Sequence, residues 1–71
     1  AESLYDWKKR GQIHYFLCPK DGLDRSTRLV VNTKFEQDVR GSNVLVFEHS
    51  TSAIRVVVES GMVREVQSVE L

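Results

Sequence analysis

The sequence lacks the features that mark secreted and membrane proteins. It has one cysteine, so it cannot form an internal disulfide, whereas a small secreted domain usually needs two or more cysteine pairs. Its apolar runs are far shorter than the roughly 20 residues of a membrane-spanning helix. No segment has the three-part pattern of a signal peptide. We therefore expect an intracellular, cytoplasmic protein with no membrane partner.

An excess of charge of either sign is also missing. Ten Lys and Arg residues balance ten Asp and Glu residues, which gives a formal net charge of zero. The chain as a whole therefore has no electrostatic attraction to nucleic acid or to an anionic membrane. Residues 1–35 carry seven basic and four acidic side chains, and residues 36–71 carry three basic and six acidic ones. The folded molecule has a positive and a negative side unless the fold interleaves the two halves.

Motifs that carry enzyme or metal chemistry are absent from the sequence. The four glycines stand alone at expected turns and form no phosphate-binding pattern. The only thiol, Cys18, follows His14 by four residues, which on a strand is too far for a hydrogen bond. Cysteine and histidine spacings typical of zinc sites do not occur. We expect no enzyme activity, no cofactor, no metal and no small-molecule substrate, and we interpret Cys18 as a small core residue.

The apolar content is sufficient for one small core. With 71 residues, of which 41% are hydrophobic, the chain is expected to form a single domain over residues 1–71. Residues 1–11 are predicted to form a short helix. Ser3 can cap its start, Asp6 lies three residues later, and Gly11 follows a basic run that suits the helix end.

Short runs rich in β-branched and aromatic residues follow from Gln12 onward, separated by turn residues. The predicted strands are Gln12–Cys18, Thr27–Asn32, Val44–Glu48, Ala53–Glu59 and Met62–Val69. Residues 33–39 are open between an extension of the second strand and a helical turn, because Phe35 and Val39 are four apart. Residues 62–70 also fit helical spacing, but their density of valines favours a strand.

These elements predict an α+β fold that is mainly β. A short N-terminal helix packs on a small antiparallel sheet of five strands, which is rolled or closed into a barrel. The element order is similar to that of Sm-like, SH3-like and OB-type small barrels. That similarity concerns the order of elements alone, and fold-level analogy assigns no function.

The valine-rich C-terminal segment is the first candidate binding surface. It has more apolar residues than one face of a half-buried hairpin uses, so we expect part of it to be shared with another chain. The candidate interface residues are Ile54, Arg55, Val56, Val58, Val63 and Val66. Arg55 is expected to pair with a carboxylate, such as Glu65 or one of a partner. Burial of both faces within a tightly rolled barrel is the alternative.

Basic and aromatic residues are interleaved in the N-terminal half, which is the second candidate surface. Proteins that bind single-stranded nucleic acid use cations to contact phosphates and aromatic rings to stack on bases. The candidate residues are Trp7, Lys8, Lys9, Arg10, His14, Tyr15, Lys20, Arg25 and Arg28. The alternative is that the rings belong to the core and the cations are solvated at a helix end.

The sequence as a whole favours a non-catalytic binding module. We expect a small regulator that docks on a protein partner or associates with itself as a homo-oligomer. A nucleic-acid-binding module that uses the basic, aromatic N-terminal half is the rival hypothesis.

Overall fold

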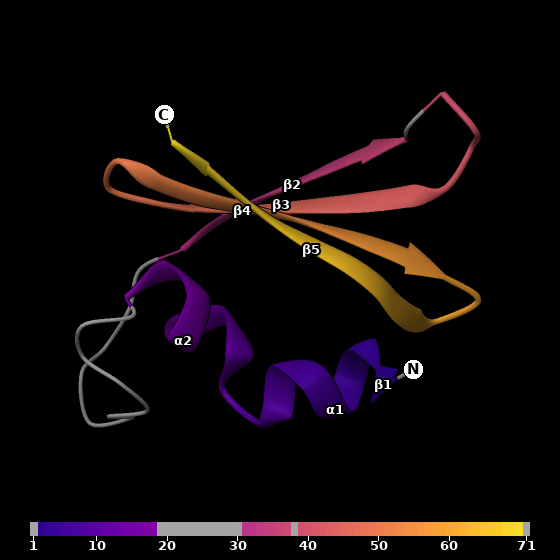
Figure 1. The fold of residues 1–71 in the computed structure, drawn as a ribbon, viewed down its shortest axis with the longest axis horizontal. Helices are drawn as coiled ribbons and strands as arrows, with labels where there is room; N and C mark the ends of the chain where they lie inside the picture. The colour runs from indigo at the N-terminus through magenta and orange to yellow at the C-terminus, as the bar shows by residue number, and fades with distance from the viewer. Residues whose placement is uncertain (1, 19–30, 38, 71) are drawn as a thin grey trace.

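Two short helices cover one face of an antiparallel sheet in the computed structural model, which describes residues 2–18, 31–37 and 39–70 (Figure 1). The elements in chain order are β1 (Glu2–Ser3), α1 (Leu4–Lys9), α2 (Gln12–Leu17), β2 (Asn32–Gln37), β3 (Asn43–His49), β4 (Ser52–Glu59) and β5 (Met62–Glu70). The strand order is β1-β5-β4-β3-β2. The predicted mainly β, five-stranded antiparallel architecture is therefore confirmed in outline.

The predicted closure into a barrel is not confirmed. Among the described residues, the sheet is open, with β1 at one edge and β2 at the other. The likeness to Sm-like and SH3-like barrels is therefore not confirmed either. The expected single helix is replaced by two, and strand β1 precedes them.

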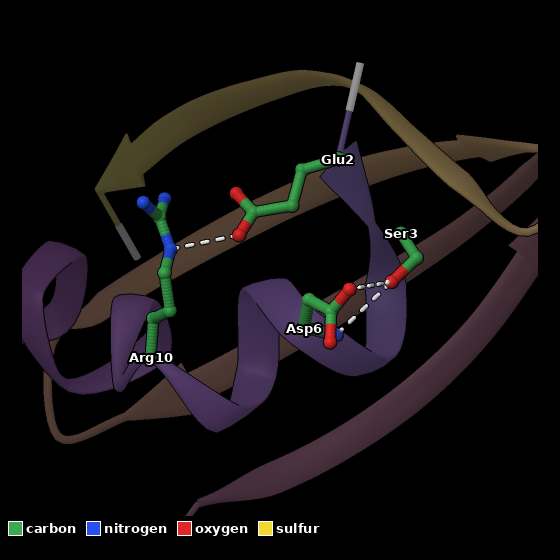
Figure 2. Close-up of polar contacts among 4 residues, drawn as sticks. All are labelled: Glu2, Ser3, Asp6 and Arg10. Carbon is green, nitrogen blue, oxygen red and sulfur yellow. Dashed lines mark hydrogen bonds and ion pairs between the residues drawn. The ribbon is translucent and has the colours of Figure 1, made fainter.

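Helix α1 begins at the predicted cap. The Asp6 backbone N–H donates to Ser3 Oγ at 3.2 Å, and that hydroxyl donates to Asp6 Oδ2 at 2.9 Å (Figure 2). Ser3 is therefore the N-cap of α1, and its side chain satisfies one of the open N–H groups of the first turn. Gly11 has a positive φ of 78°, which separates α1 from α2. The helix is shorter than the predicted one because Glu2 and Ser3 pair with β5.

The prediction of a strand over Gln12–Cys18 is wrong, because Gln12–Leu17 forms helix α2. The β-branched and aromatic residues of this segment favour a strand by propensity, but packing overrides propensity here. On a helix, the spacing of Ile13, Phe16 and Leu17 forms one apolar stripe, and all three pack in the core. On a strand, the same side chains would point to opposite faces.

Strands β3, β4 and β5 match the predicted strands to within one residue at each end. Strand β5 has a β-bulge, marked by a register shift between Val57 and Val58 of the facing strand. Val63 and Val66 lie three residues apart, yet they pair with Val58 and Val56 on the same face of the sheet. The bulge therefore explains the spacing of Val63 and Val66, whereas Val69 pairs with Ala53 and lies on the opposite face of the sheet.

Residues 33–39 were expected to form either an extension of the second strand or a helical turn. The structure has a strand here, β2, which runs to Gln37. It pairs with β3 from Asn32, which faces Glu48, to Gln37, which faces Asn43. Of the predicted strand Thr27–Asn32, residues 27–30 lie outside the described residues. All six residues of β2 are exposed.

The core lies between the helices and the sheet. Its buried members are Trp7, Leu17, Phe47, Ile54, Val56 and Val58. The rings of Trp7 and Phe16 are stacked, with 6.2 Å between centroids and 22° between planes, which ties α1 to α2. The sheet residues of this core are Phe47, Ile54, Val56 and Val58. We call the face of the sheet on which they lie the helix side, and the opposite face the outer face.

The outer face has apolar residues beneath ion pairs. Val46 of β3 is only 8% exposed and lies between Lys34 of β2 and Arg55 of β4. Lys34 Nζ lies 3.0 Å from Glu48 Oε1, and Arg55 Nη2 lies 3.7 Å from Glu36 Oε2. The alkyl stems of Lys and Arg cover apolar neighbours while their charged ends stay in water. The sheet is thus apolar on both faces at its centre without closing into a barrel.

Candidate functional site

The predicted C-terminal interface residues lie mostly in the core. Ile54, Val56 and Val58 are 1%, 0% and 7% exposed beneath the helices. Val63 and Val66 are half-buried against the same cluster. These apolar residues therefore contribute to the core of this chain.

Arg55 pairs with a carboxylate, as the sequence predicts, but the acidic residue differs from the one expected. Its partner is Glu36 of β2, whereas Glu65 accepts a hydrogen bond from Gln67 Nε2 at 2.8 Å. Arg55 and Glu36 lie on strands separated by β3, so the arginine reaches across β3 on the outer face. The sequence did not reveal this pairing because it depends on the order of strands in the sheet.

Of the predicted nucleic-acid residues, those that the structure describes do not bring their rings together as an open stacking surface. Trp7 is 5% exposed and packs against Phe16, so its face is not available to a base. Tyr15 is exposed and lies edge-on to Phe16 at 5.4 Å between centroids, and His14 is half-buried. The predicted residues Lys20, Arg25 and Arg28 lie outside the described residues.

Among the predicted nucleic-acid residues that the structure describes, the exposed cations Lys8, Lys9 and Arg10 lie along and just after α1. Arg10 Nε is 2.7 Å from Glu2 Oε2, so this cation is already paired (Figure 2). Lys9 Nζ lies 5.9 Å from the centroid of the Tyr5 ring. An open hollow of about 560 Å³ is lined by Leu4, Tyr5, Lys8 and Lys9. The helix has six residues and presents two lysines beside one aromatic ring. This arrangement is typical of a solvated helix surface, whereas a protein that binds a single strand has a charged groove that follows the phosphate backbone.

The described part of the chain shows no constellation for metal chemistry. His14 and Cys18 are one helical turn apart, since the Cys18 N–H donates to the His14 carbonyl oxygen at 2.8 Å, which corrects the predicted separation along a strand. Cys18 packs at the edge of the core. Over residues 2–18, 31–37 and 39–70, no group of three His, Cys, Asp or Glu residues is placed to hold a metal ion. Nor does a helix in these ranges have the length and apolarity to cross a membrane.

Strand β2 forms an open edge that the sequence interpretation missed. Within the described ranges, no strand pairs with the side of β2 that faces away from β3, and we call this side the β2 edge. An edge strand presents a row of backbone N–H and C=O groups to which another strand can bond. Phe35, at the middle of the strand, is 64% exposed. In the sequence, the β2 edge is marked only by this single aromatic residue between Lys34 and Glu36, in a segment that also fits a helical turn.

The register shows which backbone groups of β2 point outward. A two-residue loop joins β3 to β4, so the flanking residues His49 and Ser52 form a hydrogen-bonded pair. Such pairs alternate along an antiparallel ladder, and residues 44, 46 and 48 therefore direct their backbone groups toward β2. By the same alternation, Thr33, Phe35 and Gln37 direct theirs to the β2 edge. We call these three the outward residues.

The side chain of Phe35 lies on the helix side of the sheet but beyond the helices. It pairs with Leu45, which is half-buried against the core. Helices α1 and α2 lie over β5, β4 and β3. Strand β2 runs away from α1 toward its own C-terminal end (Figure 1). The edge therefore combines open backbone groups with an uncovered aromatic ring.

Comparison of the chain with protein-family models, curated proteins and solved structures gives no match. The candidate site therefore rests on the geometry of the chain itself. That geometry favours the β2 edge over the flank of α1 and over the valines of β4 and β5 that pack against the core.

Proposed function

We propose that the chain is a non-catalytic protein-binding module that accepts an extended protein segment as an additional strand at the β2 edge. The open edge with its exposed Phe35 is the observation that carries the proposal. In strand addition, main-chain hydrogen bonds provide affinity and alternate side chains provide specificity. The outward residues supply the backbone groups, and Phe35 supplies an apolar contact beside Leu45.

The charges of β2 add selectivity to this edge. Lys34 and Glu36 lie on the outer face, one on each side of Phe35 in the sequence. Opposite charges on facing strands stabilise a pair, whereas like charges that face each other destabilise it. A bound strand is therefore expected to have an acidic residue opposite Lys34, a basic residue opposite Glu36, and an apolar residue opposite Phe35.

The nucleic-acid hypothesis has less support. Trp7 is committed to the core, and Arg10 is paired with Glu2. Lys8 and Lys9 remain as exposed cations on α1. Tight binding of a single-stranded oligonucleotide that weakens steeply with salt would favour this rival.

A proline scan of the two sheet edges tests the proposal. Peptides are selected from a phage library of random linear sequences, and their synthetic copies are titrated by calorimetry. Thr33→Pro removes an outward N–H without removing a bond to β3. Ser68→Pro is the matched control, because the N–H of Ser68 points away from β4 at the opposite edge.

We expect Thr33→Pro to weaken peptide binding by between about twofold and tenfold, since a backbone hydrogen bond contributes about 0.5–1.5 kcal/mol net and 1.4 kcal/mol corresponds to tenfold. Ser68→Pro should leave binding unchanged. Both variants must show the far-UV circular dichroism spectrum of the parent chain. Equal loss in both variants, or binding that Thr33→Pro does not affect, would contradict strand addition at the β2 edge.

A further inference from the structure

We infer that the strand accepted at the β2 edge is β2 of a second copy, so that two chains form a symmetric dimer with one continuous sheet. This inference rests on the proposed function of the β2 edge and names its partner. The order of charges along β2, the direction of its backbone groups and the position of Phe35 all favour a second copy as the partner.

A two-fold axis places the same segment of both copies in antiparallel contact. When Phe35 faces Phe35 of the second copy, Lys34 faces Glu36 of that copy, and Glu36 faces its Lys34. Both charged residues of the strand then meet opposite charges. Thr33 faces Gln37, so no charge is left opposite an apolar residue within β2.

The neighbouring registers are less favourable. Facing residues must lie on the same face of the sheet, so the register can shift only in steps that keep this parity. One such shift places Lys34 opposite Lys34 of the second copy, and the shift in the other direction places Glu36 opposite Glu36. Like charges that face each other are destabilising. The charge pattern therefore selects the register centred on Phe35.

The backbone geometry is compatible with the same register. The outward residues Thr33, Phe35 and Gln37 are those whose N–H and C=O groups are directed to the β2 edge. Centring on Phe35 pairs outward residues only with outward residues. The two Phe35 residues thus form a hydrogen-bonded pair across the axis.

The side chains of both faces fit this arrangement. On the helix side, Phe35 is 64% exposed and would meet the same ring of the second copy, and aromatic cross-strand pairs stabilise sheets. On the outer face, Lys34 lies 3.0 Å from Glu48, and Glu36 lies 3.7 Å from Arg55. Pairing Lys34 with Glu36 of the second copy joins these ion pairs into an alternating row across the axis.

A charge-exchange experiment tests the dimer. Sedimentation velocity is measured up to millimolar concentration, because one added strand buries less than the roughly 800 Å² per partner of a standard interface. Lys34→Glu and Glu36→Lys each place like charges opposite each other, so each variant alone should dimerise at least about tenfold more weakly than the parent chain. Mixed together, the two variants place opposite charges at both positions and should restore association as a heterodimer. Lys8→Glu makes the same charge change on α1 and should dimerise like the parent chain.

Two results would overturn the self-pairing. One is a parent chain that remains monomeric at every concentration, and the other is a mixture that associates no better than its components. Neither result bears on peptide binding at the β2 edge, which the Thr33→Pro titration decides separately. Far-UV circular dichroism checks the folding of each charge variant. If either fails to fold, Thr33→Pro decides the matter, since dimerisation as strong as that of the parent chain after the loss of its outward N–H contradicts the model.

Discussion

Replacing Trp7 by Ala should remove a large part of the stability of the fold. Trp7 is 5% exposed, and its indole ring stacks on Phe16 of α2. The substitution therefore leaves a cavity between the two helices and the sheet. Truncating a buried aromatic residue to Ala costs about 3–5 kcal/mol. A domain of this length has a free energy of unfolding of about 4–11 kcal/mol at about 0.05–0.15 kcal/mol per residue. The variant should therefore lose between about a quarter and all of its stability.

Urea unfolding followed by far-UV circular dichroism measures this effect, because Trp7 is the only tryptophan and its fluorescence is lost in the variant. Phe35→Ala is the matched control, since it also removes an aromatic ring but at a site that is 64% exposed. At concentrations where the chain is monomeric, this control should lose less than about 1 kcal/mol. A loss below about 1 kcal/mol for Trp7→Ala would refute the placement of Trp7 in the core and restore it as a candidate stacking residue.

Two further predictions concern local structure. Ser3→Ala should lower the free energy of unfolding by about 1 kcal/mol, because it removes both hydrogen bonds of the α1 cap, and thermal unfolding measures the change. Ser3→Asp keeps a capping acceptor, so a loss equal to that of Ser3→Ala would show that the cap is not the cause. Gly61 has a φ of 76° in the Ser60-Gly61 turn, and a Cβ built there would meet nothing within 4 Å. Gly61→Ala should therefore cost about 1–2 kcal/mol through backbone strain alone, and Gly61→Asn should cost less, so equal losses would contradict the strain argument.

The strands that the sequence predicted well are those in which pattern and turn chemistry agree. β3 and β4 are apolar runs joined by a two-residue turn, and local propensity and packing both favour a strand there. In β5 the density of valines favours a strand, although the spacing of those valines also fits a helix. The start of α1 was predictable for the same reason, because Ser3 and Asp6 form a recognisable cap.

The parts that the sequence did not reveal depend on tertiary contacts. Residues 12–17 have strand propensity, and only their contact with Trp7 and the sheet shows why the helical stripe is preferred. The candidate site was missed for a related reason. Phe35 is one exposed ring in a polar segment, and its importance comes from the position of β2 at the end of the strand order, which no local pattern encodes. The buried valines were prominent in the sequence, but they serve the core.

Amide hydrogen exchange at residue resolution tests the central claim most directly, because it measures each backbone group of β2 separately. At low protein concentration, the amides of Lys34 and Glu36 should be protected by their bonds to β3, and those of Thr33, Phe35 and Gln37 should exchange rapidly. At high concentration, or with a selected peptide bound, the three outward amides should become protected. Unchanged exchange at Thr33, Phe35 and Gln37 under both conditions, or new protection confined to Ser68 at the opposite edge, would contradict the account.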